Sequence, residues 1–408
     1  MRMRMTEAIS AVVFAVLLCA ATVADNVPAG HLFAGTSNPG CVYSYAGGSN
    51  WRRISPVLGY AVLDLIEFKG RLYAATMSTS DAQGGDGGVW RYEDDDTWTL
   101  VGEQMDNQVC DLIEWQGECY AGTAWRGGKL FVLDEDTETF EFLDYVDGWS
   151  GIRAMYVWKF PWIQLGDIWW DKFGRYDGKA AHHDVHLWGS CVYDFAAYDD
   201  ALYAAAFMGR LFRSYDGVTW AEVRGYEDGN LWELETFRGA LYMGDNEGRL
   251  RTLDGSHDTA LVWTTSQGII SMLADGDEML YIGTGGEAGA YYGSSTSGDG
   301  YVYAFAADGA AQPVSGRLGT GVQCLYRLDF DLGVTALSAT AIGTTSAQFC
   351  GQVTSNEAGE GCQYRFCYWT TDDEQMFIRH TDWTGEVSTG ETFRATVTDM
   401  SAGCEYRF

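Results

Sequence analysis

The feature that most constrains this chain is a hairpin pattern that recurs along it. In one clear copy, apolar-rich runs at residues 62–68 and 72–76 flank a Lys-Gly turn. Comparable hairpins begin at Val109, Cys191, Leu231 and Ile269. Short runs of alternating apolar residues joined by tight turns predict antiparallel strand pairs, and their recurrence predicts a repeat architecture.

The repeat has seven units, whose innermost strands begin 38 to 53 residues apart, at Val62, Val109, Ile152, Val192, Leu231, Ile269 and Val322. This spacing is typical of a four-stranded propeller blade. Residues 31–36 form a predicted second strand with no first strand before it, and residues 322–328 a first strand with no second after it. We therefore expect an all-β, seven-bladed β-propeller over residues 31–328, closed by pairing between its N-terminal and C-terminal strands.

Two features of these units resemble elements of known propeller families. Residues 211–220, Leu-Phe-Arg-Ser-Tyr-Asp-Gly-Val-Thr-Trp, resemble the Asp-box S-x-D-x-G-x-T-W of sialidase-type propellers with one residue fewer, and residues 89–98 and 42–51 are weaker copies. Paired glycines along the units resemble kelch repeats. In sialidase-type propellers the Asp-box forms a turn between outer strands, away from the ligand, so the resemblance implies a fold and not an activity.

A different pattern follows a short linker at residues 329–333. Short alternating runs between residues 334 and 397 precede a segment at residues 400–406 that resembles the corner of fibronectin type III domains, with Tyr406 as the corner tyrosine. The resemblance implies a small β-sandwich over residues 334–408. We expect this sandwich to be incomplete, because the chain stops at Phe408 before a last strand.

The first 24 residues have the features of a secretory signal. Arg2 and Arg4 precede an apolar stretch at residues 9–18 and a small-residue segment at residues 20–24. About 15 apolar residues are too few to span a bilayer. We therefore expect cleavage near Asp25, a mature chain with no membrane span, and a secreted, extracellular or cell-surface location. Export would permit disulfides among the nine remaining cysteines, whose odd number leaves at least one unpaired.

The charge balance excludes one class of partner. Lys and Arg number 26 against 57 Asp and Glu, which gives a formal net charge of −31. Because phosphate backbones bind basic surfaces, nucleic acid is not an expected partner, whereas cations or basic surfaces fit this charge.

Four carboxylates fall at one aligned position near the start of the innermost strands. Asp64, Asp111, Asp194 and Glu233 occupy this position, and the other three units hold Ala154, Ser271 and Cys324 there. Gathered at the mouth of a central channel, such acids would raise one another's pKa or bind a cation, and oxygen ligands suit Ca²⁺. The alternative is structural, with each carboxylate hydrogen-bonded to the backbone of the neighbouring blade.

Two long connections give a second candidate ligand region. They run over residues 77–88 and 285–300, in blades that lie close together once the ring closes. We expect both to overhang the same side of one face, where their polar and aromatic residues are candidate ligand contacts. These residues are Asp81, Asp86, Glu287, Tyr291, Tyr292 and Asp299. The competing interpretation is that both connections are insertions rich in Gly and Ser that have no role.

The fourth unit carries a cluster of histidines and six tryptophans between residues 149 and 188. On a strand, His182, Asp184 and His186 share a face by the two-residue period and could bind a transition metal. The alternative is an outer strand with solvated histidines. The tryptophans could stack on sugars, but aromatic side chains in a propeller more often pack between blades.

These observations favour a secreted or cell-surface binding or adhesion protein whose loop face binds carbohydrate or a surface protein without catalysis. Catalytic signatures such as the G-x-S-x-G elbow and the H-E-x-x-H helix are absent from the sequence. Two alternatives remain open. One is a carbohydrate-active enzyme, a sialidase-like hydrolase or a lyase, that uses the channel-mouth carboxylates. The other is a structural component of the cell envelope.

Overall fold

The computed structural model describes residues 32–45, 49–78, 87–93, 96–125, 127–169, 172–186, 191–224, 229–253, 259–286, 298–306, 309–327, 332–340, 346–356, 362–364, 367–370, 379–380, 384–387, 392–397 and 406–407. Contacts between Cα atoms divide the chain into two compact units, with the boundary between Leu328 and Asp329. Apart from one 3-10 turn, η1 (Phe207–Gly209), the regular elements of the described residues are strands. No helix in this part of the chain is long and apolar enough to cross a membrane.

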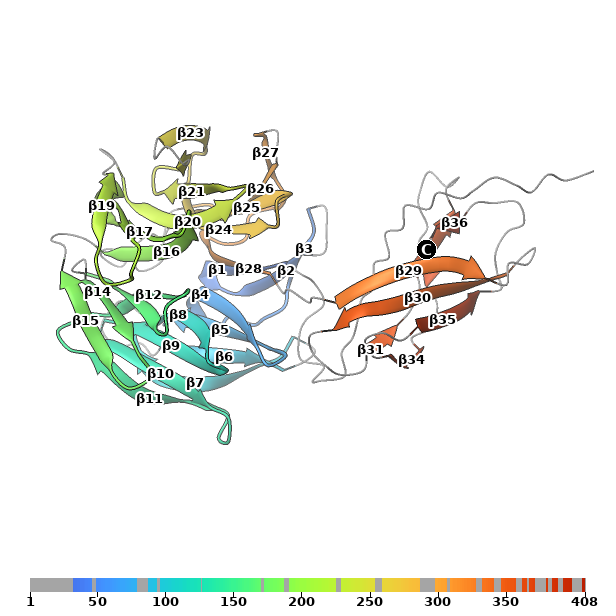
Figure 1. Cartoon of the computed structure of the whole chain (residues 1–408), viewed down its shortest axis with the longest axis horizontal. Coiled ribbons are helices and arrows are strands. Elements are labelled where there is room, and N and C mark those ends of the chain that lie inside the picture. Colours follow the sequence, from blue (N-terminus) through green and yellow to red (C-terminus); the bar gives the residue numbers. More distant parts are fainter. Residues whose placement is uncertain are drawn as a thin grey trace, which may run out of the picture. The chain divides into compact units, whose positions relative to one another are not determined.

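The first unit is a β-propeller-type fold built from antiparallel strands (Figure 1). Among the described residues, hydrogen-bonded pairing arranges these strands into seven sets of four, which we number 1 to 7. The first strand of each set contacts the first strands of the two adjacent sets, so these seven innermost strands form a closed ring. Each set is written below from its innermost strand outward.

Set 1 is β28 (Gly321–Arg327), β1 (Leu32–Gly40), β2 (Val42–Tyr45) and β3 (Trp51–Arg53), and set 2 is β4 (Gly59–Phe68), β5 (Arg71–Met77), β6 (Gly87–Tyr92) and β7 (Trp98–Asp106). Set 3 is β8 (Gln108–Trp115), β9 (Glu118–Ala124), β10 (Gly128–Asp134) and β11 (Thr139–Val146), and set 4 is β12 (Ile152–Val157), β13 (Ile163–Asp167), β14 (Lys172–Tyr176) and β15 (Ala181–His186). Set 5 is β16 (Val192–Tyr198), β17 (Ala201–Ala206), β18 (Leu211–Ser214) and β19 (Ala221–Arg224). Set 6 is β20 (Leu231–Phe237), β21 (Ala240–Asp245), β22 (Arg249–Leu253) and β23 (Thr259–Thr264), and set 7 is β24 (Gly268–Asp275), β25 (Met279–Gly285), β26 (Val302–Ala306) and β27 (Ala311–Pro313).

Set 1 joins the two ends of this unit. In it, β28 pairs with β1, with Leu32 opposite Arg327. Beside this pair, the Thr320 N–H donates to the Ser37 carbonyl at 2.9 Å, and Gln323 Nε2 donates to Ser37 Oγ at 3.2 Å. The expected pairing between the N-terminal and C-terminal strands is therefore confirmed, and the first and last strands of the ring stabilise each other.

Adjacent sets pack through a small residue on one second strand and a branched residue on the next innermost strand. A Cβ added to Gly122 would lie 2.8 Å from Ile152 Cγ2, and one added to Gly244 would lie 2.4 Å from Ile269 Cγ2. The equivalent residues of the other five sets are also glycine or alanine, namely Gly35, Ala75, Gly166, Ala205 and Gly283. Larger side chains at these places would push neighbouring sets apart, because the packed interior has no spare volume.

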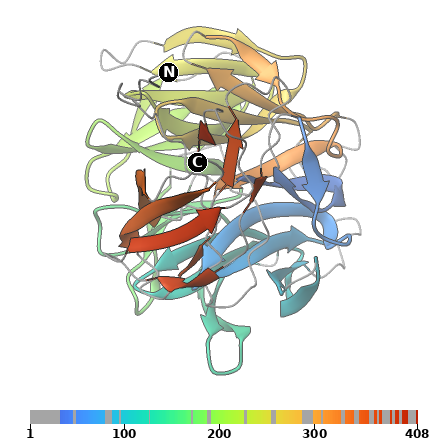
Figure 2. The same cartoon turned by 90° about the vertical axis from the view of Figure 1, so that its right-hand side faces the viewer.

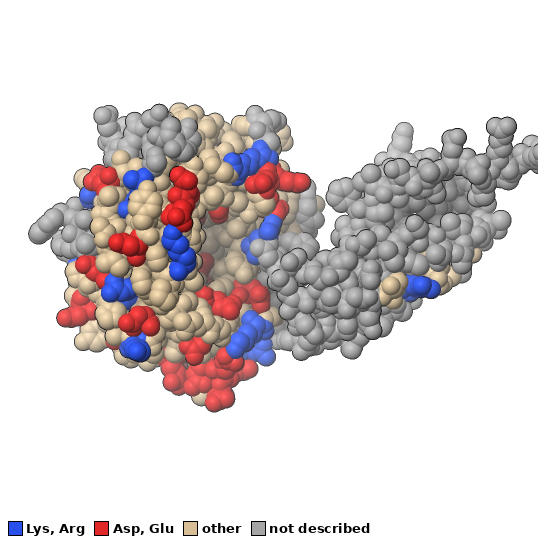
Figure 3. Space-filling view, viewed as in Figure 1, with Lys and Arg blue, Asp and Glu red and all other residues tan. Residues whose placement is uncertain are grey.

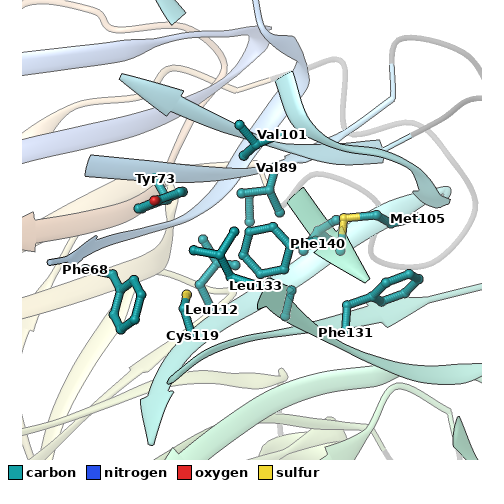
Figure 4. Packing of buried hydrophobic residues seen from close by; sticks show 13 residues of the cluster. Phe68, Tyr73, Val89, Val101, Met105, Leu112, Cys119, Phe131, Leu133 and Phe140 are labelled. Atoms are coloured by element: carbon teal, nitrogen blue, oxygen red, sulfur yellow. The ribbon is translucent and has the colours of Figure 1, made fainter. Parts of the chain in front are cut away.

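Hydrophobic clusters fill the spaces between sets, and Figure 4 shows the one between sets 2 and 3. In this cluster, Phe68 and Tyr73 of set 2 pack with Leu112, Phe131 and other residues of set 3, each less than 9% exposed. Successive side chains of a strand point to opposite sides of its sheet. A strand in the middle of the ring therefore supplies apolar residues to two different neighbours, which explains the nearly continuous apolar runs in the repeated hairpins.

On the face of the first unit seen in Figure 3, acidic and basic side chains lie among one another, and acidic side chains gather at its lower end. The β10–β11 hairpin extends outward from the other strands (Figures 1 and 2), and its acidic turn pairs with basic residues of set 2. Arg71 Nη1 lies 3.3 Å from Glu138 Oε1, and Arg91 Nη1 lies 2.9 Å from Glu138 Oε2. These ion pairs thus neutralise part of the excess negative charge of the chain.

The described residues of the second unit form three small antiparallel sheets. One has the order β29 (Leu332–Thr340), β30 (Ala347–Asn356) and β35 (Thr392–Val397). Another pairs β31 (Cys362–Tyr364) with β34 (Thr384–Val387). In the third, β32 (Cys367–Thr370) lies between β33 (Arg379–His380) and β36 (Tyr406–Arg407). Strands are therefore present after residue 334, and the alternation expected along them stays a prediction.

Candidate functional site

Every innermost strand carries a β-bulge just before the aligned carboxylate position. In β4, Val62 pairs with Thr76 and Asp64 pairs with Ala75, so Leu63 is the extra residue. The extra residues of the other strands are Cys110, Arg153, Tyr193, Trp232, Ile270 and Gln323. A bulge shifts the register by one residue, which turns the residues on its two sides to opposite faces of the sheet. Val62 therefore faces the preceding set, where it packs against Gly35, and Asp64 faces the following set.

The four aligned carboxylates all accept a backbone N–H group from the next innermost strand. Asp64 Oδ2 accepts from Leu112 at 2.8 Å, Asp111 Oδ2 from Met155 at 2.5 Å, Asp194 Oδ2 from Leu234 at 2.8 Å, and Glu233 Oε1 from Met272 at 3.3 Å. The ring of carboxylates expected from the sequence is therefore present, and its members brace neighbouring sets as in the structural alternative.

The remaining three junctions between sets use other side chains. Ser271 Oγ donates to the Val322 carbonyl at 2.8 Å, and Cys324 Sγ lies 3.9 Å from the Val62 carbonyl oxygen. Set 4 has Ala154 at the aligned position, and there the Tyr156 hydroxyl accepts the Ala197 N–H at 3.3 Å. All seven junctions of the ring thus have a contact between a side chain and the backbone of the next set.

Two of the carboxylates form a hydrogen-bonded pair. Asp64 and Asp111 bond to each other through their side chains, which requires one of them to hold a proton. Burial raises the pKa of Asp64 to about 6, although the N–H groups of Leu112 and Leu65 oppose the rise. Burial and the charge of Asp64 together raise the pKa of Asp111 well above its ordinary value. We therefore assign the shared proton to Asp111, which donates to Asp64.

The other side of the ring combines carboxylates with one arginine. Burial raises the pKa of Asp194 to about 7, and burial together with the charge of Asp194 raises the pKa of Glu233. Burial also raises the pKa of Glu235, two residues further along β20, to about 7. Arg153, the bulge residue of set 4, stabilises the charged forms of Asp194 and Glu233 and bonds to the Cys110 thiol. Arg153 was not among the predicted site residues, although it directly precedes Ala154, the aligned residue of a unit without a carboxylate.

The channel carboxylates do not form a recognisable metal centre. Within the described residues, no group of three or more His, Cys, Asp or Glu side chains is arranged to hold a metal ion. Each acid instead directs one oxygen to the backbone of the neighbouring set. Proton binding and inter-strand bracing are therefore the chemistry that this arrangement supports, and Ca²⁺ at the channel mouth stays a prediction.

Most of the residues expected in the long connections lie outside the described part of the chain: Asp81, Asp86, Glu287, Tyr291 and Tyr292. Asp299 is described. Its Oδ1 lies 2.8 Å from Arg317 Nε, and its backbone N–H donates to Gln267 Oε1 at 3.4 Å. Asp299 therefore belongs to an ion pair at the edge of the connection.

The histidine cluster of set 4 is not arranged as predicted. In β15, His183 pairs with Gly174 and Val185 pairs with Phe173, so Asp184 is the extra residue of a bulge. The bulge interrupts the two-residue period that was expected to place His182, Asp184 and His186 on one face. His182 Nε2 lies 3.0 Å from Asp177 Oδ2, and Asp184 pairs with Arg175. The His186 side chain lies outside the described residues.

Several aromatic residues of set 4 serve packing. Trp149 is buried among apolar residues of sets 3 and 4. Phe160 and Trp162 stack with ring centroids 5.0 Å apart, and the Arg175 guanidinium lies 5.3 Å from the Trp162 centroid. The Trp162 ring therefore already has an aromatic and a cationic partner within the protein. For these residues the packing interpretation is confirmed.

The segment that resembles an Asp-box forms a compact turn between β18 and β19. Asp216 Oδ1 accepts the N–H groups of Val218 at 2.9 Å and Thr219 at 2.7 Å. Trp220 then stacks on Phe173 of set 4, with centroids 4.2 Å apart. The turn therefore ties set 5 to set 4 and has a structural role.

A second candidate surface lies on the start face, by which we mean the end of the sets where the innermost strands begin. Trp125 follows β9 and Trp169 follows β13, and both connections lie on this face because second strands run antiparallel to innermost strands. Their rings meet edge to face, with centroids 5.3 Å apart and an interplanar angle of 79°. Neither Trp125 nor Trp169 was among the predicted site residues, because their proximity depends on how sets 3 and 4 pack.

Comparisons with known proteins bear on the fold alone. No model of a protein family matches the sequence, and no curated protein matches it. Among solved structures, a protein from Lactobacillus plantarum is similar over 74% of this chain and 99% of its own, with 12% identity and a TM-score of 0.51. Sqt1 of Saccharomyces cerevisiae is similar over 80% of this chain and 94% of its own, with 12% identity and a TM-score of 0.50.

A third similar structure is an extracellular domain attributed to a hybrid two-component system of B. thetaiotaomicron, with 13% identity and a TM-score of 0.50. The similarity covers 86% of this chain and 47% of that chain, so this chain spans about half the length of that structure. At such low identity these likenesses show a β-propeller-type fold and carry no information on ligand or activity.

Proposed function

We propose that this chain is a secreted or cell-surface binding protein that captures carbohydrate or a surface protein on its start face without catalysis. The observation that supports this proposal is the use of all four channel carboxylates as acceptors for the backbone of neighbouring sets. A general acid or a nucleophile must reach the substrate, whereas these oxygens brace the ring.

The proposal includes the finer architecture expected from the sequence. It comprises a signal over residues 1–24, a seven-bladed propeller over residues 31–328 that resembles Asp-box and kelch-like propellers, and a fibronectin type III-like sandwich over residues 334–408. The seven sets of four strands support the propeller. The orders β29-β30-β35 and β33-β32-β36 support the sandwich, because they correspond to its A-B-E sheet and to the sheet that contains strands C and F. Tyr406, the expected corner tyrosine, lies on β36.

Binding and hydrolysis measured in parallel test this proposal. We would titrate the full chain with a panel of oligosaccharides and assay the same panel for released reducing ends. The Asp64→Asn variant keeps an oxygen that can accept the Leu112 N–H, so we expect it to fold and to bind as the wild type does, with no turnover by either. Turnover by the wild type that disappears in a folded Asp64→Asn variant would refute binding without catalysis.

One observation favours a second candidate, a carbohydrate-active hydrolase or lyase. Asp64 and Asp111 share a proton and both have raised pKa values, a property of enzymes that divide acid and base roles between two carboxyl groups. Turnover with a pH optimum between the two pKa values, abolished by both Asp64→Asn and Asp111→Asn, would establish this candidate in place of the first.

A further inference from the structure

The tryptophan pair of the start face, Trp125 and Trp169, offers a binding surface to which no other role has been assigned. Both side chains are partly exposed. Both pack against the buried residues Cys110, Ala124 and Ile168. One side of the pair is therefore held by the protein, and part of each ring remains accessible to a ligand.

The backbone beneath the pair is held by interlocking hydrogen bonds. The Trp125 N–H donates to the Ser150 carbonyl at 3.0 Å, and the Ile168 N–H donates to the Gly151 carbonyl at 3.2 Å. The turn at residues 150–151 thus supports both tryptophan-bearing connections. Gly151 fits there because an added Cβ would lie 2.4 Å from Ala124 Cβ.

A buried carboxylate completes this support. Asp167 is fully buried, its Oδ1 accepts the Gly151 N–H at 3.3 Å, and its carboxylate also accepts the backbone N–H of Trp169. Lys172 Nζ lies 3.8 Å from its Oδ2. The protein loses less conformational entropy when a ligand binds a rigid surface than when it binds a mobile one. This bracing therefore favours binding to the pair.

Trp125 also has a strained backbone. Its φ is +93°, a value that a bulky side chain rarely adopts. Strain of this kind is found more often at ligand sites than elsewhere. The strained residue is thus one of the two whose rings meet at 5.3 Å.

We propose that Trp125 and Trp169 form a stacking platform for a neutral oligosaccharide, an inference that rests on the proposed binding function. The apolar face of a pyranose ring, with its axial C–H groups, fits an aromatic ring held against the protein. The net charge of −31 repels polyanions, so neutral glycans are favoured over polyuronates and sulfated chains.

Calorimetric titration of the full chain with cellohexaose, xylohexaose and β-1,4-galactotetraose tests the platform. We expect at least one of these to bind, and we expect Trp125→Ala and Trp169→Ala each to weaken that binding about tenfold or more. Polygalacturonate is expected not to bind. Trp158→Ala is the matched control, because Trp158 follows β12 at the opposite end of the set, and we expect it to leave the affinity unchanged. Trp169→Phe keeps an aromatic ring and serves if the alanine variant does not fold.

Each result distinguishes the platform from the wider function. Binding that is unaffected in folded Trp125 and Trp169 variants would overturn the platform and leave carbohydrate binding intact. A folded wild type that binds polygalacturonate and none of the neutral oligosaccharides would overturn the platform and leave carbohydrate binding in place. A folded wild type that binds none of the four glycans would overturn both the platform and carbohydrate as the ligand of the proposed function.

Discussion

Replacing Asp194 by asparagine is expected to reduce the dependence of stability on pH. Burial raises the pKa of Asp194 from an ordinary value of 3.8 to about 7. Between about pH 4 and pH 7 the folded chain therefore binds more protons at this site than the unfolded chain does. The stability that this group contributes is fully present below its ordinary pKa and is lost as the pH rises through about 7.

The size of the effect follows from the pKa. At about 1.36 kcal/mol for each unit between 3.8 and about 7, ionising Asp194 in the folded state costs about 4 kcal/mol. Solvent that reaches the partly exposed carboxylate reduces this cost to about 2–4 kcal/mol. Asparagine at position 194 carries no charge, and its side-chain oxygen can still accept the Leu234 N–H. We therefore expect the variant to be more stable than the wild type at pH 8 and similar to it at pH 4.

Urea unfolding followed by tryptophan fluorescence at half-unit steps from pH 4 to pH 8 measures this difference. The free energy of unfolding of the wild type should fall more steeply with rising pH than that of Asp194→Asn. Both proteins keep Asp64, Asp111 and Glu233, so the difference reports the loss of the Asp194 charge, which includes its effect on the pKa of Glu233 and of Asp111. Two parallel curves, whatever their offset, would refute the reasoning, since they would show that Asp194 titrates alike in the folded and unfolded chains.

Three further predictions concern packing, turns and thiols. Gly244→Ala should lower the free energy of unfolding by about 1–3 kcal/mol, because the added Cβ would lie 2.4 Å from Ile269 Cγ2. Gly316 has open space around it, so Gly316→Ala should change the free energy of unfolding by less than about 0.5 kcal/mol in the same urea titrations. Asp216→Ala should cost about 1–2 kcal/mol by thermal unfolding, since two backbone N–H groups lose their acceptor. Burial raises the pKa of the Cys110 thiol to about 12, so mass spectrometry should find Cys110 unmodified after iodoacetamide treatment of the folded chain at pH 8 and modified in urea.

Each of these three predictions has an outcome that contradicts it. Equal effects of alanine at positions 244 and 316 would show that the close contact between sets 6 and 7 relaxes without cost. An unchanged melting temperature for Asp216→Ala would mean that the turn does not stabilise the fold. Alkylation of Cys110 in the folded chain would mean that the ring opens in solution.

The architecture of the first unit could be predicted from sequence because its repeated units can be aligned with one another. Seven copies of one hairpin gave the same alignment that the strand pairing shows, including the closing pair β28–β1 and the aligned residues from Asp64 to Cys324. Local alternation of apolar residues marks strands, and composition marks turns. These signals are local, so they can be recognised in the sequence without knowledge of how the strands pack.

The sequence by itself therefore determined an all-β repeat, its units and the positions of its acids. Only the tertiary structure decided what those acids do. A strict two-residue period would place Val62 and Asp64 on one face, whereas the bulge at Leu63 turns Val62 to the preceding set and Asp64 to the following one. A bulge shared by every unit leaves their spacing unchanged, so no comparison among the repeats reveals it. The contacts of Asp64 with Asp111 and of Trp125 with Trp169 arise between sets, because the packing of one set against the next, and not the local chain, brings them together.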